Sequence, residues 1–154
     1  MKKTILFAFL LAIGFQSFSQ VSSTEQELIK SYFKLTKMAI VENAMALSEK
    51  DGAIFWPLHK QYDVEASKLN QFRIDYLTDY VAQVENITDE QVDEFLKQSN
   101  SYNKKMVSLK SKYYKLMKKE LSSKVAIRFM LVEEYIQTAV KYELLETLPW
   151  IGDF

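Results

Sequence analysis

The chain has 154 residues, with 20 basic and 20 acidic side chains and no cysteine. The lack of Cys excludes disulfides and thiolate metal sites, and the balanced charge gives no reason to expect nucleic acid as a partner. Residues 58–148 contain neither Gly nor Pro. Because a β-rich fold needs such residues at its turns, the sequence predicts an all-α fold of four helices.

The start of the chain predicts export. Two lysines precede an apolar run over residues 5–15, which is too short to span a bilayer and is typical of a secretory signal peptide. We expect cleavage near Ser19, so that residues 1–19 are a leader and residues 20–154 form a single all-helical domain in the periplasm or outside the cell. An uncleaved anchor is the alternative.

The first helix is expected to begin at Ser22 or Ser23, where either serine can cap it, and to run to about Lys50. The pair Asp51-Gly52 is expected to end it, because Gly is unfavourable inside a helix.

The second helix is expected to begin between Asp51 and Trp56 and to reach about Asn86. Pro57 is tolerated if it falls in the first turn and kinks the helix if it does not. The apolar stripe of this helix comprises Phe55, Leu58, Tyr62, Leu69, Phe72, Tyr76, Tyr80 and Val84.

Thr88 is expected to open the third helix. Its hydroxyl can accept the backbone N–H of Gln91, and the Gln91 side chain can reach back to the Thr88 N–H, which is a capping box. The apolar positions keep a seven-residue spacing: Val92, Phe95, Tyr102, Met106, Leu109, Tyr113 and Leu116. Such a seam favours an antiparallel neighbour, so the second and third helices should form a long helical hairpin.

The last helix is expected to be capped by Ser122 or Ser123 and to stop before Pro149. Its predicted apolar stripe comprises Val125, Phe129, Val132, Ile136, either Ala139 or Val140, and Leu144. The tail from Trp150 to Phe154 is apolar; it either folds back onto the helices or meets a partner.

No catalytic or metal site is expected. His59 is the only histidine, and Asp63 follows one helical turn later, which would supply two metal ligands at most. We therefore expect His59 to face solvent or an interface, and a metal ligand is the alternative. No nucleophile lies beside a base, so we expect no enzyme activity and no cofactor.

Residues 95–119 hold eight lysines and no acidic residue. A plain solvated face is the simplest interpretation. Three of the lysines, however, share one heptad position beside the apolar seam, and such a surface would attract acidic, partly unfolded chains. The candidate client-binding residues are Tyr102, Lys105, Met106, Lys112, Tyr113 and Lys119.

The run Ile87-Thr88-Asp89-Glu90-Gln91 resembles the Leu-Thr-x-x-Gln motif of the Spy/CpxP family of periplasmic stress proteins, with Ile87 in place of Leu. In that family the motif usually occurs twice, and residues 121–125 look like a decayed second copy, closer to the first than is usual. The segments 55–58 and 126–129 are also similar to uncharacterised secreted helical proteins related to that family.

This resemblance implies an ATP-independent chaperone that binds unfolded or misfolded polypeptides and acts as a homodimer with the hairpin in its interface. The alternative that it implies is an accessory protein of a membrane sensor in a stress or metal response.

Overall fold

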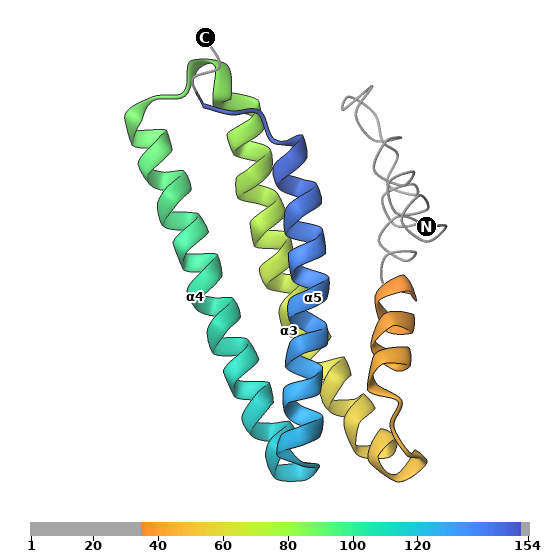
Figure 1. Ribbon diagram of the computed structural model, residues 1–154. Helices are drawn as coiled ribbons and strands as arrows, with labels where there is room; N and C mark the ends of the chain where they lie inside the picture. Colours follow the sequence, from red (N-terminus) through yellow and green to blue (C-terminus); the bar gives the residue numbers. More distant parts are fainter. Residues whose placement is uncertain (1–34, 152–154) are drawn as a thin grey trace, which may run out of the picture. The chain divides into compact units, whose positions relative to one another are not determined.

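The computed structural model describes residues 35–151, in which all regular structure is helical and no strand occurs (Figure 1). The all-α prediction is therefore confirmed for this part of the chain. The expected leader, the expected start of the first helix at Ser22 or Ser23, and Phe154 lie outside the described residues. Between residues 35 and 151, no helix is long and apolar enough to cross a membrane.

A short helical segment covers residues 35–45, and the chain divides into two compact units after Ile40. In the first unit, the described residues are one stretch of helix in which Leu35 and Met38 are exposed. The second unit begins at Val41 and contains the three long helices. Val41 and Met45 belong to its core.

The predicted boundary at Asp51-Gly52 is wrong. The short helix ends at Met45, and Ala46 takes a left-handed φ of 43°. The next helix, α3 (Glu49–Gln83), begins before the glycine, because the Ser48 hydroxyl caps it by accepting the Asp51 N–H at 3.2 Å. Gly52 lies inside α3 and is buried.

Pro57 lies inside α3 beyond its first turn. It has no N–H, so the carbonyl of Ala53 has no partner from the helix at this point. Helical structure nevertheless continues through α3 and the 3₁₀ turn η1 (Val84–Asn86), which agrees with the predicted end near Asn86.

The helix start predicted at Thr88 is present. Helix α4 (Asp89–Glu120) has Thr88 as its N-cap. The Gln91 N–H donates to the Thr88 hydroxyl at 3.3 Å, and the Thr88 N–H donates to Gln91 Oε1 at 2.8 Å. The Gln91 amide also bonds to Gln83 at the end of α3, so the cap joins both helices across the turn.

The last helix, α5 (Ser123–Thr147), has Ser122 as its N-cap and ends before Pro149 as predicted. The Ser122 hydroxyl accepts the Val125 N–H at 3.2 Å. Helices α3 and α4 lie side by side and run in opposite directions, and α5 returns beside α4 (Figure 1). Side chains connect α5 to α3, as in the contact between Phe129 and Tyr62.

The core of the second unit is aromatic. The ring of Tyr62 on α3 packs edge-on against Tyr113 of α4 and Phe129 of α5, with centroid distances of 5.4 and 5.2 Å. Phe55 makes a similar contact with Phe129 at 5.4 Å. Edge-to-face pairs of this kind add to the free energy gained by burial. Tyr62 therefore contacts both of the other long helices.

Candidate functional site

The structure separates the six predicted client-binding residues into two groups. Tyr102, Met106 and Tyr113 are buried in the core. The seven-residue spacing that drew attention to them places them on the seam between α4 and its neighbours, and the Tyr102 hydroxyl donates to Asn70 of α3 at 3.2 Å. They cannot form a surface in this conformation, so this part of the prediction is corrected.

Lys105, Lys112 and Lys119 are exposed on α4. Lys112 forms an ion pair with Glu65 of α3 at 2.6 Å, and Lys119 contacts Glu120 at 3.2 Å. The Lys105 ammonium lies 5.1 Å from the centre of the Phe72 ring. Each of these lysines thus has a neighbour within the chain, and none stands beside an exposed aromatic residue of the predicted set.

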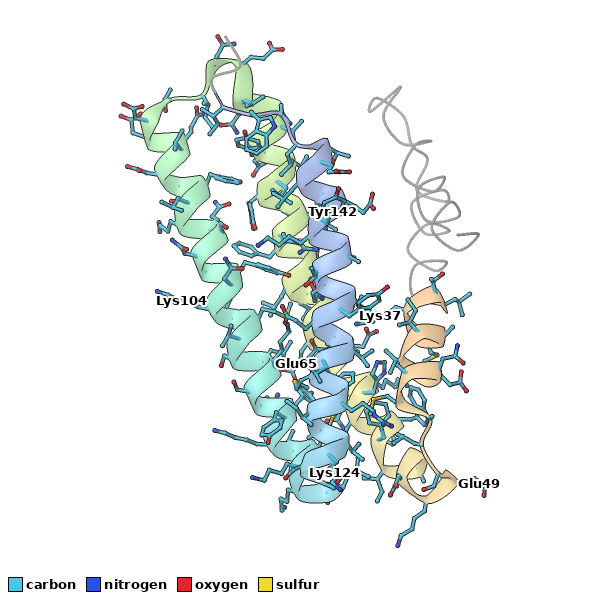
Figure 2. All side chains as sticks on the ribbon, in the orientation of Figure 1. Lys37, Glu49, Glu65, Lys104, Lys124 and Tyr142 are labelled. Carbon is cyan, nitrogen blue, oxygen red and sulfur yellow. The ribbon has the colours of Figure 1, made fainter. Side chains whose placement is uncertain are left out.

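Glu65 joins α3 to α4 through two donors. Its Oε1 atom accepts from Lys112 at 2.6 Å and from the Tyr113 hydroxyl at 2.7 Å. These two hydrogen bonds lower the pKa of Glu65, and the bond from Lys112 has the larger effect. Burial, and then the bond to Glu65, raises the pKa of Tyr113 to about 12. These contacts connect α3 to α4 through Glu65, which is labelled in Figure 2.

His59 is buried, which differs from the expected position at solvent or an interface. Its ring lies 5.7 Å from Phe55, 5.5 Å from Trp56 and 5.5 Å from Phe129, measured between centroids. Within residues 35–151, no group of three or more His, Asp or Glu side chains is placed to hold a metal ion. His59 acts in this structure as part of the aromatic core.

A buried carboxyl group lies next to this cluster. Glu133 of α5 is fully buried, and the Tyr62 hydroxyl donates to its Oε2 atom at 3.0 Å. Burial, and then the nearby Glu133, raises the pKa of Tyr62. Both groups are closed off from solvent, so a substrate cannot reach them without unfolding the unit.

A shallow, open depression near the start of α3 is lined by Glu42, Ser48, Glu49, Trp56 and Pro57, among others. Ser48 is already the N-cap of α3. The two glutamates, when ionised, accept hydrogen bonds and donate none. The depression is too open to exclude water from a bound molecule.

The feature that the sequence reasoning missed is the outer side of α5. Five large apolar residues there are between 49% and 69% exposed, and we call them the outer face of α5: Ile127, Leu131, Tyr135, Tyr142 and Leu145. At 3.6 residues per turn they fall within an arc of about 80°. The buried residues Ala126, Phe129, Glu133 and Ile136 lie on the opposite side.

The spacing of these residues by four, four, seven and three is visible in the sequence. The stripe predicted for this helix, however, is the other one, which contains Phe129 and Ile136. A helix with one apolar stripe normally turns that stripe towards the core. Here only the inner stripe does so, and the outer face is left on the surface.

The apolar tail also has a large exposed side chain. Pro149 is held to α3 by a hydrogen bond of 2.6 Å between its carbonyl oxygen and the Tyr80 hydroxyl. Trp150, which follows, is 75% exposed. The described part of the tail is thus attached to the helices while its largest side chain remains in solvent.

Comparisons with models of protein families, with curated proteins and with solved structures gave no match. The geometry of α5 therefore carries the functional argument.

Proposed function

We propose that the protein is an exported, non-enzymatic, chaperone-like protein that binds unfolded or misfolded polypeptides through the outer face of α5. One observation carries this proposal: α5 is apolar on two opposite sides, and the described part of the chain covers only the inner one. A helix that is apolar all round is ordinarily buried, so an uncovered second side points to an interaction.

The outer face has the dimensions of an extended binding strip. It runs from Ile127 to Leu145, which corresponds to about 27 Å at 1.5 Å per residue. Each large apolar side chain gains roughly 1.5–3 kcal/mol when it is fully buried. A segment of an unfolded chain with several apolar residues matches such a strip without requiring a particular sequence.

The basic outer side of α4 supports the same proposal. Lys104, Lys115 and Lys118 are exposed and take part in none of the ion pairs of residues 35–151. Figure 2 labels the first of them on α4. Positive charge of this kind raises the rate at which acidic chains arrive, and its effect weakens with salt. The resemblance to the Spy/CpxP family and the expected leader add to the case for an exported chaperone.

The test measures aggregation of several unrelated unfolding proteins in the presence of the purified protein. We expect near-stoichiometric amounts to suppress aggregation, and Leu131→Lys to remove most of this effect at an unchanged melting temperature. Val107→Lys is the matched control, because Val107 on α4 and Leu131 are both 64% exposed but only Leu131 belongs to the outer face of α5.

Two outcomes would overturn the proposal: no suppression at any salt concentration, or equal suppression by the Leu131→Lys variant and the native protein.

A further inference from the structure

We infer that, in the absence of a client, the outer face of α5 binds a second copy of the same chain, with the two α5 helices antiparallel and Thr138 at the twofold axis. This inference rests on the proposed function in one respect: it describes the regulation of the same face. The resting protein would be a dimer that conceals its own binding strip.

The first argument is that the outer face is nearly symmetric about its middle. Leu131 and Leu145 lie seven residues before and after Thr138, and all three positions are exposed. Tyr135 and Tyr142 lie three residues before and four residues after it. A twofold axis through Thr138 therefore places Leu131 opposite Leu145 of the second copy and Tyr135 opposite Tyr142, as an isologous interface requires.

The second argument is charge complementarity beside the apolar strip. Glu134 and Lys141 are both exposed, lie one heptad apart, and border the strip on the same side. In an antiparallel pair related by a twofold axis, like sides of the two helices face each other. Glu134 of one copy then lies beside Lys141 of the other, and the symmetry produces this contact twice.

The orientation follows from the same two residues. In a parallel pair, opposite sides of the helices face each other, so Glu134 would lie beside Tyr135 of the second copy and the two ion pairs would not form. Glu134 already accepts from Lys110 of α4 at 2.5 Å. Its carboxylate has acceptor sites for a second donor as well, so this contact does not prevent pairing with Lys141.

The size of the strip predicts a weak, reversible dimer. One helix face of five large side chains buries less than about 800 Å² per copy, the area typical of stable complexes. A modest affinity is what a resting form requires if a client is to displace the second copy.

The test uses the lack of cysteine in the chain. Thr138→Cys introduces a single thiol at the expected axis, and mild oxidation or a short bis-maleimide crosslinker should join two copies. Ser108→Cys, exposed on the outer side of α4, is the matched control and should remain monomeric under the same treatment. Sedimentation of the native protein from about 1 μM to about 1 mM, the range of weak complexes, should show concentration-dependent dimers.

Charge exchange tests the orientation. Lys141→Glu should raise the dissociation constant by about tenfold, because both symmetric ion pairs become repulsive contacts. Glu134→Lys combined with Lys141→Glu should restore much of the affinity. A monomer over the whole concentration range, or equal crosslinking of the Thr138→Cys and Ser108→Cys variants, would overturn the inference.

These results are separate from those that test the proposed function. A monomeric protein that still suppresses aggregation removes the dimer and leaves the proposed function standing. A dimer that fails to suppress aggregation at any dilution removes the proposed function and leaves the dimer standing.

Discussion

Tyr62 should be the most sensitive single position for the stability of the helical unit. It is fully buried on α3, its ring contacts Tyr113 of α4 and Phe129 of α5, and its hydroxyl donates to the buried Glu133 at 3.0 Å. The substitution Tyr62→Phe removes the hydroxyl alone. Because the two ring contacts remain, the measured loss reports the hydrogen bond and little else.

The size of the loss follows from this geometry. A hydrogen bond contributes on the order of 1 kcal/mol, and removing one donor from a buried acceptor costs about 1–3 kcal/mol. We therefore expect the free energy of unfolding to fall by about 2 kcal/mol. For a chain of this length, that corresponds to a decrease in melting temperature of about 4–8 °C.

The assay is urea denaturation followed by circular dichroism. Tyr135→Phe is the matched control, because Tyr135 is exposed on α5 and its hydroxyl makes no hydrogen bond among the described residues; its effect should lie within about 0.5 kcal/mol. A Tyr62→Phe variant as stable as this control would refute the reasoning and show that the buried carboxyl does not depend on Tyr62.

Three further measurements follow from the structure. Thr88→Ala should lower the free energy of unfolding by about 1 kcal/mol through loss of the cap, whereas Thr88→Ser should retain most of it; equal losses would show that the hydroxyl does not act as the cap. Burial raises the pKa of Tyr113 to about 12 from 10.0, so the unfolded chain releases this proton first, and stability should be unaffected below pH 10 and fall as the pH rises towards 12. The pKa of Tyr62 is raised too and acts in the same direction, so Tyr113→Phe should weaken but not abolish the loss of stability at alkaline pH, measured by urea titrations. If the variant and the native protein lost stability with pH at the same rate, Tyr113 would not be a cause of the loss. A dimer joined by a disulfide between two Thr138→Cys chains should lose aggregation suppression and recover it when the disulfide is reduced. Undiminished activity of the disulfide-linked form would show that client and second copy do not share a face.

The positions of helix starts were predictable where a local side chain makes the cap. Thr88 with Gln91 and Ser122 are found as N-caps of α4 and α5, because the donors they satisfy lie three residues or fewer away. Such contacts depend on neighbouring residues alone, so the sequence contains all the information that they require.

The start of α3 was mispredicted because two local signals compete there. Asp51-Gly52 indicated a helix end, but Ser48 caps the helix three residues before Asp51. At Gly52, a Cβ atom would lie 3.5 Å from the Trp56 indole nitrogen, which is an ordinary contact. A side chain would thus be tolerated at Gly52, and the Ser48 cap decides the boundary.

The predicted client surface was half wrong for a different reason. Tyr102, Met106 and Tyr113 lie on a regular seam, and a regular seam of aromatic residues is what a helix core also requires. The lysines were placed correctly on the surface, since charged side chains are rarely buried without partners. Whether a tyrosine faces solvent depends on the neighbouring helix, and the sequence of one helix does not specify that.

Helix α5 shows most clearly what periodicity alone leaves undecided. Its buried side contains Glu133, and its exposed side contains Leu131 and Tyr135, so the polarity of adjacent positions is reversed from the usual pattern. The reversal is possible because Tyr62, 71 residues earlier in the chain, supplies a donor to the carboxyl group. Folding of the described unit does not require apolar residues on the outer side, since nothing in the described unit covers them. The outer face therefore contributes little to the stability of this unit, and its apolar side chains are best explained by a partner outside it.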